Sequence, residues 1–178
     1  VVNDLGGNAD GSGSGKVADD VVAEIAKLGG KAVANYDSVA TMAGGLAIFQ
    51  TAISAFGACD ILVNNAGILR DKTIFNMDES DWDAVIAVHL KGHFCCTQPF
   101  ARYIRETNRR ACRIINFSSV SGLFGNFGQS NYGAAKIGIA GLSKNIAVDM
   151  AKFNVRSNCI SPFAFTRMVG SIPTDTPE

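Results

Sequence analysis

The chain has 178 residues, 47% of them hydrophobic, and its 16 basic side chains balance 16 acidic ones. This length suits one domain with a substantial buried core. A net charge of zero gives no electrostatic basis for binding nucleic acid or an anionic membrane, and no apolar run approaches the roughly 20 residues that span a bilayer.

The first residues and the cysteines favour an intracellular protein. The chain opens on Val1-Val2-Asn3-Asp4 instead of a basic segment leading into an apolar one, so we expect no signal peptide. The five cysteines lack C-x-x-C spacing, which favours reduced thiols, and with only two histidines we expect no metal site. We therefore predict a cytoplasmic location.

The first half of the chain alternates strand and helix signals. Residues 1–4 are typical of the end of a strand, and residues 5–15 of a flexible glycine-rich loop. Apolar residues at helical spacing predict helices over 17–28 and 42–56. Residues 31–36, between them, predict a short strand.

The second half continues the alternation. Residues 61–63 predict a wholly apolar strand, of the kind that is buried on both faces of a parallel sheet. A long helix follows from Asp81, with a kink or break expected at Pro99. Residues 113–117 and 155–161 predict two further strands with a helix between them. The pattern indicates an α/β fold: a doubly wound parallel sheet, helices on both faces, and a ligand site along the carboxyl ends of the strands.

The stretch from Ser118 to Lys136 carries the clearest chemical signal. Tyr132 and Lys136 are spaced i, i+4, which stacks a phenol and an ammonium on one helix face. A tyrosine that exchanges protons near neutral pH must lower its pKa by roughly 3 from about 10, and a neighbouring ammonium favours the phenolate. The serine hydroxyls before the helix can hold a substrate oxygen. Spacing alone is more typical of an ordinary packed helix with a surface Tyr and Lys, because Y-x-x-x-K is common.

Three motifs together resemble the short-chain dehydrogenase/reductases: Tyr132-x-x-x-Lys136, Ser119 thirteen residues before the tyrosine, and Asn64-Asn65-Ala66-Gly67 after a strand. The resemblance implies a Rossmann-like fold, with residues 1–178 as a single dinucleotide-binding domain. It also implies an NAD-dependent enzyme that interconverts a secondary alcohol and a ketone. By resemblance, Tyr132 is the general acid/base, Ser119 orients the substrate, and Lys136 lowers the phenol pKa and holds the nicotinamide ribose.

The same resemblance assigns residues to the adenosine side of the cofactor. Asp4, at a strand end, would accept hydrogen bonds from both ribose hydroxyls and repel a 2′-phosphate, which implies NAD as the cofactor. Asp37 is similar to the family residue at the adenine edge, with Ser38 beside it. A turn or capping role fits this second pair almost as well.

Further residues are assigned to the nicotinamide side. Asn64, Ala66 and Gly67 resemble the segment whose backbone runs beside the cofactor, although the asparagines fit a role in bracing the sheet equally well. Thr166 resembles the hydroxyl residue that binds the nicotinamide carboxamide. The family's Pro-Gly before it is here Pro162-Phe163.

The glycine loop offers a competing assignment. Gly11 to Gly15 (GSGSG), between a strand and a helix, with Asp37 at the end of the next strand, is similar to a dinucleotide fingerprint. We reject this interpretation because Lys16 stands where the third glycine is required and the loop is too long for a tight turn. The family assignment leaves the first β-α unit and the last strand unaccounted for, so we expect this sequence to be a fragment of the domain.

His89 departs from the wider family, which usually has an asparagine that completes a tetrad with Ser119, Tyr132 and Lys136. An imidazole can donate and accept hydrogen bonds, so a proton relay is one interpretation. A satisfied core histidine is the other, and the sequence does not choose between them.

Closer matches narrow the substrate. NDLGG, GGKAVANYDSV, NNAGILRD and GNFGQSNY resemble the (3R)-hydroxyacyl-CoA dehydrogenase part of peroxisomal multifunctional β-oxidation enzymes, a subgroup in which the histidine at position 89 is also expected. The resemblance implies a 3-hydroxyacyl-CoA substrate and leaves a peroxisomal location as the alternative. Arg70, Lys72 and Arg167 are the candidate cations for the CoA phosphates.

Two alternatives stay open. A hydroxysteroid or other alcohol dehydrogenase would need an apolar cleft, for which Phe124, Phe127, Phe163 and Phe165 are candidates. A catalytically idle binding or assembly protein is the alternative outside enzymes. By analogy with the family, we expect a homo-dimer or homo-tetramer that acts on a small molecule.

Overall fold

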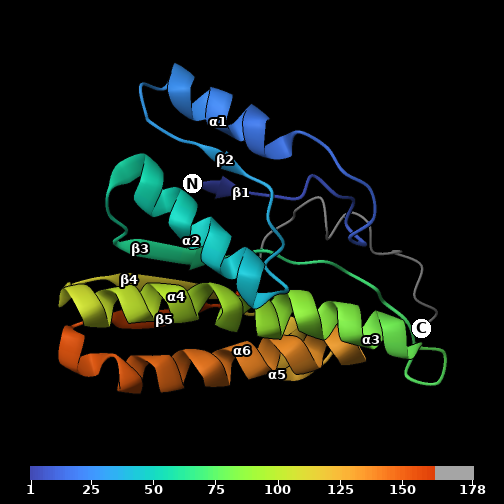
Figure 1. Ribbon diagram of the computed structural model, residues 1–178. Helices are drawn as coiled ribbons and strands as arrows, with labels where there is room; N and C mark the ends of the chain where they lie inside the picture. Colours follow the sequence, from blue (N-terminus) through green and yellow to red (C-terminus); the bar gives the residue numbers. More distant parts are fainter. Residues whose placement is uncertain (163–178) are drawn as a thin grey trace.

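The computed structural model describes residues 1–162, whose strands form two parallel sheets (Figure 1). Strand β1 (Val2–Asn3) pairs with β2 (Ala34–Asn35). Strands β3 (Ile61–Asn64), β4 (Arg113–Phe117) and β5 (Arg156–Ile160) form the second sheet in that order. Figure 1 shows β1 and β3 running in the same direction, so the carboxyl ends of both sheets face the same side. The predicted Rossmann-like α/β fold is confirmed.

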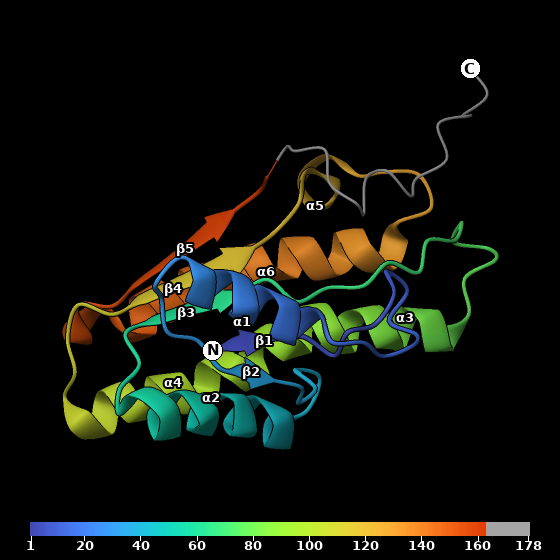
Figure 2. The ribbon, with the colours of Figure 1, turned by 90° about the horizontal axis from the view of Figure 1, so that it is seen from above.

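The helices separate into those that pack on the small sheet and those that pack on the large one. Helix α1 packs against β1 and β2, α2 packs on α4, and α4 and α6 pack against the large sheet, α4 at β3 and α6 at β4 and β5 (Figure 2). The helical segments are α1 (Val17–Lys27), α2 (Met42–Phe56), α3 (Glu79–Ile86), the π-helical η1 (Ala87–Lys91), α4 (Gly92–Thr107), α5 (Val120–Phe124), α6 (Ser130–Asp149) and the 3₁₀ turn η2 (Ala151–Phe153).

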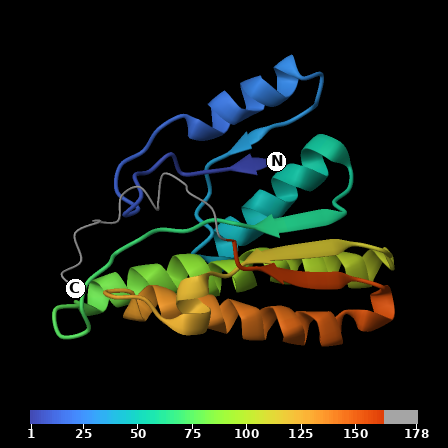
Figure 3. The same cartoon turned by 180° about the vertical axis from the view of Figure 1, so that it is seen from behind.

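The strand over residues 61–63 is not buried on both faces, which corrects the sequence prediction. Ile61 and Val63 are 59% and 52% exposed. Figure 3 shows β4 and β5 in front of α4, with no helix of residues 1–162 over the near face of the large sheet. An apolar run therefore gave the right strand but the wrong environment, because burial depends on the layer that packs above it.

The long helix after Asp78 changes its geometry at His89 and not at Pro99. Residues 87–91 are π-helical, whereas Pro99 lies inside α4. Proline has no N–H to donate to the carbonyl of Cys95 four residues earlier. That carbonyl instead lies against Gly45 of α2, where a Cβ atom would overlap it. The packing of α2 on α4 accommodates the proline without ending the helix.

One apolar cluster anchors the large sheet between α4 and α6. Phe100 and Ile104 of α4 meet Ile114 of β4 and Ile146 of α6, and Cys112 joins the same cluster. All five cysteines are free thiols, and three of them are buried while Cys159 is exposed. No helix within residues 1–162 is long and apolar enough to cross a membrane. The apolar cluster of α4, β4 and α6 fixes β4 against α6, and the candidate catalytic residues follow β4 or lie on α6.

Candidate functional site

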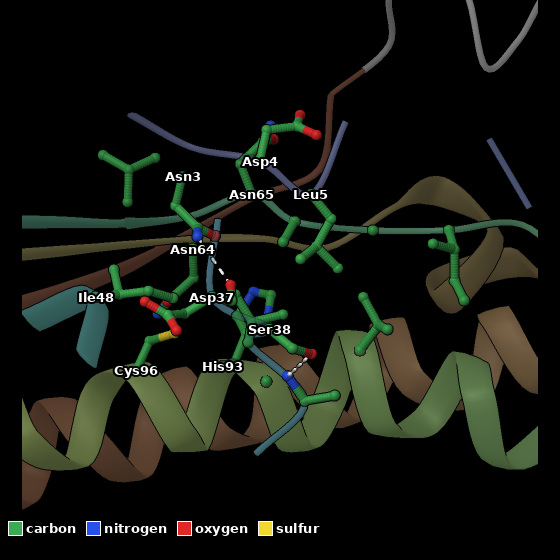
Figure 4. Close-up of a pocket in the computed structure, with 18 of the residues that line it drawn as sticks. Asn3, Asp4, Leu5, Asp37, Ser38, Ile48, Asn64, Asn65, His93 and Cys96 are labelled. Atoms are coloured by element: carbon green, nitrogen blue, oxygen red, sulfur yellow. Dashed lines mark hydrogen bonds between the residues drawn. The ribbon is translucent and has the colours of Figure 1, made fainter. Parts of the chain in front are cut away.

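Polar side chains follow the carboxyl ends of four strands. Asp4 comes after β1, Asp37 after β2, and Asn64 ends β3, while Ser118 and Ser119 come after β4. A cavity of about 630 Å³ opens between the two sheets, and Figure 4 shows Asp4, Asp37 and Asn64 around it. The carboxyl ends of the strands thus bring together several residues predicted to bind a dinucleotide, while the cavity itself also extends along the unpaired edge of β3, at Ile61, Leu62 and Val63.

The two carboxylates on the adenosine side are exposed and held by short local contacts. An oxygen of Asp4 accepts a hydrogen bond from the backbone N–H of Gly6 at 2.6 Å. Asp37 accepts one from the Asn35 amide at 2.8 Å, and the Ser38 hydroxyl accepts the N–H of Ala40 at 3.3 Å. Asp4 therefore stays open to solvent at a strand end, as an acceptor for ribose hydroxyls should. The contacts of Asp37 and Ser38 fit the turn role.

The glycine loop folds onto the loop after β3 and not into a tight turn before α1. The N–H of Leu69 donates to the carbonyl of Ala9 at 2.8 Å, and the Arg70 guanidinium donates to the carbonyl of Asp10 at 3.1 Å. Lys16, at the start of α1, makes no side-chain capping hydrogen bond. These contacts favour our rejection of the loop as a phosphate-binding fingerprint.

Asn64 braces the sheet through a buried polar chain. Its amide nitrogen donates to Asn116 of β4 at 3.0 Å and to Thr97 of α4 at 3.1 Å. Asn116 in turn donates to Ser143 of α6 and Ser157 of β5, each at 3.1 Å. Buried amides need such partners, and here they tie three strands to two helices. Of the two roles left open for the Asn64 side chain, these contacts favour bracing.

Ser119, Tyr132 and Lys136 come together where β4 ends against α6. Ser119 caps α5 by accepting the N–H of Ser121 at 3.2 Å. Tyr132 lies in the first turn of α6, and Lys136 follows one turn later, as the i, i+4 spacing predicts. The ammonium nitrogen of Lys136 lies 5.4 Å from the centre of the Tyr132 ring and donates to the carbonyl of Phe117 at 2.7 Å.

The pKa of Tyr132 does not shift in the direction expected from the neighbouring Lys136. Burial raises the pKa of Tyr132, the Ser119 hydroxyl lowers it, and the negative charge of Asp71 raises it further, so the net direction is upward. Burial also lowers the pKa of Lys136 to about 8. We expected Lys136 to pull the phenol pKa down. Because its ammonium is directed at the Phe117 carbonyl and is itself desolvated, that effect does not dominate in this structure.

His89 is buried, and its ring lies edge-on against the ring of Tyr132. Its ring centre lies 5.1 Å from that of Tyr132, with the planes at 90°. One ring nitrogen, Nε2, lies 2.8 Å from the carbonyl and 3.1 Å from the N–H of Ile68, and burial lowers the pKa of the imidazole to about 3. His89 is therefore neutral at pH 7, and either of two tautomers satisfies Nε2. A Cβ atom at Gly67 would overlap this ring, so the glycine makes room for the histidine.

Two of the candidate phosphate-binding cations are already paired. Lys72 lies 2.7 Å from carboxylate oxygens of both Asp78 and Asp81, and Arg70 lies 3.5 Å from Asp81. These contacts contradict the idea of free cations in this loop. Four residues named from the sequence lie outside the described residues: Phe163, Phe165, Thr166 and Arg167.

Sequence reasoning missed the polar residues that tie the start of α6 to the loop after β3. Asn131 and Gln129 are buried, and both hydrogen-bond to residues 70–81. The available signal was the run GNFGQSNY, whose polar residues flank the tyrosine directly.

The motif residues and the fold agree with one family, and the family model described as short chain dehydrogenase matches residues 12–176. The chain belongs to the short-chain dehydrogenases. A crystal structure of a short chain dehydrogenase from Mycobacterium avium superposes with a TM-score of 0.82 at 47% identity, covering 90% of this chain and 59% of that one.

Curated short-chain dehydrogenase relatives are longer than this chain. A short-chain type dehydrogenase/reductase of Mycobacterium tuberculosis is 51% identical over 97% of this chain and 60% of its own length. The peroxisomal multifunctional enzyme type 2 of Drosophila melanogaster is 52% identical over 98% of this chain and 29% of its own length. A hydroxyacyl-CoA dehydrogenase of M. tuberculosis is 40% identical over 100% of this chain and 57% of its own length. The chain thus spans well under two thirds of the relatives it matches.

Proposed function

We propose that the protein containing this chain is an NAD-dependent dehydrogenase that interconverts a 3-hydroxyacyl-CoA and the corresponding ketone. One observation carries the proposal: the Tyr132 phenol, the Ser119 hydroxyl and the Lys136 ammonium converge where β4 ends against α6. In the proposed oxidation, Tyr132 accepts the proton of the substrate hydroxyl while Ser119 holds the substrate oxygen. The nicotinamide, when bound, takes up the hydride.

The proposed cofactor contacts fit the residues at the strand ends. Asp4 is exposed, and among the described residues its carboxylate accepts only the nearby N–H of Gly6, which leaves acceptor capacity for the hydroxyls of an adenosine ribose and disfavours a 2′-phosphate. Asp37 and Ser38 would border the adenine. The backbone at Asn64, Ala66 and Gly67 would run beside the nicotinamide half.

Nearer the reacting centre, Lys136 and Tyr132 would contact the nicotinamide ribose, and Thr166 the carboxamide. His89 is the proposed relay: its neutral ring can hold a proton on either nitrogen, and it packs on the Tyr132 ring. The proposal treats residues 1–178 as one dinucleotide-binding domain, continued in the rest of the protein.

The acyl-CoA assignment is supported by the name of one relative, a hydroxyacyl-CoA dehydrogenase, and by the resemblance of the chain to a peroxisomal multifunctional enzyme type 2. A hydroxysteroid is the second candidate, favoured by Phe124 and Phe127, which are 86% and 79% exposed beside the Ser119 loop. Comparing kcat/KM for a 3-hydroxyacyl-CoA with that for a hydroxysteroid separates them. A higher value for the steroid would overturn the acyl-CoA assignment.

The assembly and the location belong to the same proposal. Phe94 of α4 and Ile137 of α6 are 48% and 47% exposed, which supports a homo-oligomer formed through these helices. We propose a cytoplasmic protein, with a peroxisomal location as the alternative that several relatives' names support.

The decisive experiment is Tyr132→Phe in the full-length protein, assayed with NAD and a 3-hydroxyacyl-CoA. The ring is kept and the transferable proton is removed, so we expect kcat to fall by at least about 10²-fold. Tyr36→Phe is the matched control, since Tyr36 is exposed and its hydroxyl donates to Asp19 far from α6. Turnover of Tyr132→Phe within a few-fold of the control would contradict the mechanism, whereas a wild type without turnover on these alcohols would favour an idle binding protein.

A further inference from the structure

The loop after β3 is fastened to the start of α6 by a set of hydrogen bonds. The N–H of Lys72 donates to the carbonyl of Gly128 at 2.8 Å, and Lys72 forms an isolated parallel bridge with Gln129. The amide of Asn131 donates to the carbonyl of Arg70 at 3.0 Å. The residues that these contacts join are 56 to 61 apart in sequence, so the contacts form only in the folded chain.

Asp71 makes the one hydrogen bond between side chains of these two segments that the structure of residues 1–162 contains. Its carboxylate accepts a hydrogen bond from the Gln129 amide at 2.7 Å. Gln129 is 4% exposed, is the residue that precedes α6, and its carbonyl accepts the N–H of Gly133 at 2.7 Å. Asn131 then accepts the N–H of Tyr132 at 2.7 Å. The position of the first turn of α6 thus depends on contacts that begin at Asp71.

We propose that Asp71 is a positioning residue for the reaction: through Gln129 it fixes the turn that presents Tyr132, and it places a negative charge beside the phenol. The proposal rests on the proposed role of Tyr132 as the proton acceptor. Asp71 belongs to none of the three family motifs. Its carboxylate forms no ion pair within residues 1–162.

The charges around Tyr132 support the second part of the proposal. Ser119 after β4, Lys136 on the same helix and His89 of η1 lie around Tyr132, and the Asp71 carboxylate is held at Gln129, three residues before Tyr132. His89 is neutral, because burial lowers its pKa to about 3. Asp71 is therefore the anion of this set, and its charge raises the pKa of Tyr132 whereas the Ser119 hydroxyl lowers it. Removing that charge should make the phenolate form at lower pH.

Two variants of the full-length protein separate charge from position. Asp71→Asn keeps an oxygen that can accept from Gln129 but removes the charge, so the rising acid limb of kcat against pH should move to lower pH. Gln129→Leu keeps the charge but removes the donor. In that variant kcat should fall by about tenfold or more through misplacement of the phenol, amide hydrogen exchange over residues 126–131 should accelerate, and the acid limb should not move to lower pH.

Asp78→Asn is the matched control, because it removes one carboxylate from the same loop, one that pairs with Lys72 and does not face the phenol. We expect its acid limb and its exchange over residues 126–131 to match the wild type. The proposal is overturned if Asp71→Asn leaves the limb in place or moves it no further than the control does, or if Gln129→Leu leaves both kcat and exchange unchanged. Failure of the proposed function is distinct, since it appears as retained turnover in Tyr132→Phe.

Discussion

The two ends of the candidate site are built differently. Around α6, Lys136 is buried, Tyr132 is partly buried, and each is held by contacts from another element. On β1 and β2, the carboxylates of Asp4 and Asp37 are exposed and contact only residues near them in sequence. Proton transfer needs fixed groups in a low dielectric, whereas binding a ribose needs only an accessible acceptor. The two ends should therefore respond very differently to substitution.

The largest expected contrast is at Lys136. Lys136→Met removes a group assigned both to the phenol and to the nicotinamide ribose, so we expect kcat to fall by at least about 10²-fold. Lys144→Met is the control, an exposed lysine of the same helix, and it should keep near wild-type turnover. Steady-state kinetics of the two variants measures the contrast, and equal losses would contradict it.

The buried ammonium of Lys136 should also make the free energy of unfolding depend on pH. Burial lowers the pKa of Lys136 from 10.5 to about 8, so the folded chain binds fewer protons than the unfolded one between these values. The free energy of unfolding of the wild type should therefore rise with pH across this window, by up to about 3 kcal/mol, and Lys136→Met should lack that rise. Denaturant titrations at pH 7, 8 and 9.5 measure the difference, and parallel curves for the two proteins would contradict the burial argument.

The next contrast tests the packing of His89 beneath the loop. Gly67→Ala places a methyl group where the ring of His89 lies, so we expect a loss of about 1–3 kcal/mol in the free energy of unfolding and a lower kcat. Gly141→Ala is the control, since no atom lies within 4 Å of the added Cβ and Ala favours the helix.

A double-mutant cycle locates the cause of that loss. The pair Gly67→Ala with His89→Ala should destabilise by clearly less than the sum of the single changes, because removing the ring removes the overlap. Unfolding midpoints of the four proteins measure the coupling. Simple additivity would show that the backbone at Gly67, and not the histidine, is what excludes a side chain.

The smallest expected effect is at the exposed end. Asp4→Ala should reduce the preference for NAD over NADP by on the order of tenfold, a modest change because an exposed charge acts through solvent and salt. The ratio of kcat/KM for the two cofactors measures it, with kcat for NAD largely retained. If Asp37→Ala removed the preference instead, the rejected assignment of the glycine loop as the phosphate site would be correct.

The helices, the strands and the placement of Tyr132 and Lys136 on one helix were predictable from sequence because all depend on local patterns. Periodicity of apolar residues gave α1 and α2 to within a residue, and the i, i+4 spacing put Tyr132 and Lys136 on one helix face. The parallel arrangement followed from the alternation of strands and helices, which in turn brings residues at the strand ends to one edge. Each of these inferences needs only residues that are close in sequence or a pattern that repeats along the chain.

The tertiary structure alone decided which groups are buried and what they contact. Ile61 and Val63 are exposed because no described helix covers that face. The helix becomes π-helical at residues 87–91, and α4 continues through Pro99, where the Cys95 carbonyl lies against Gly45 of α2. The pKa of Tyr132 is set by burial, by the Ser119 hydroxyl and by the charge of Asp71. None of these follows from the i, i+4 spacing of Tyr132 and Lys136. Desolvation and charge act through space over a few ångströms, so they depend on chain segments that the sequence keeps far apart.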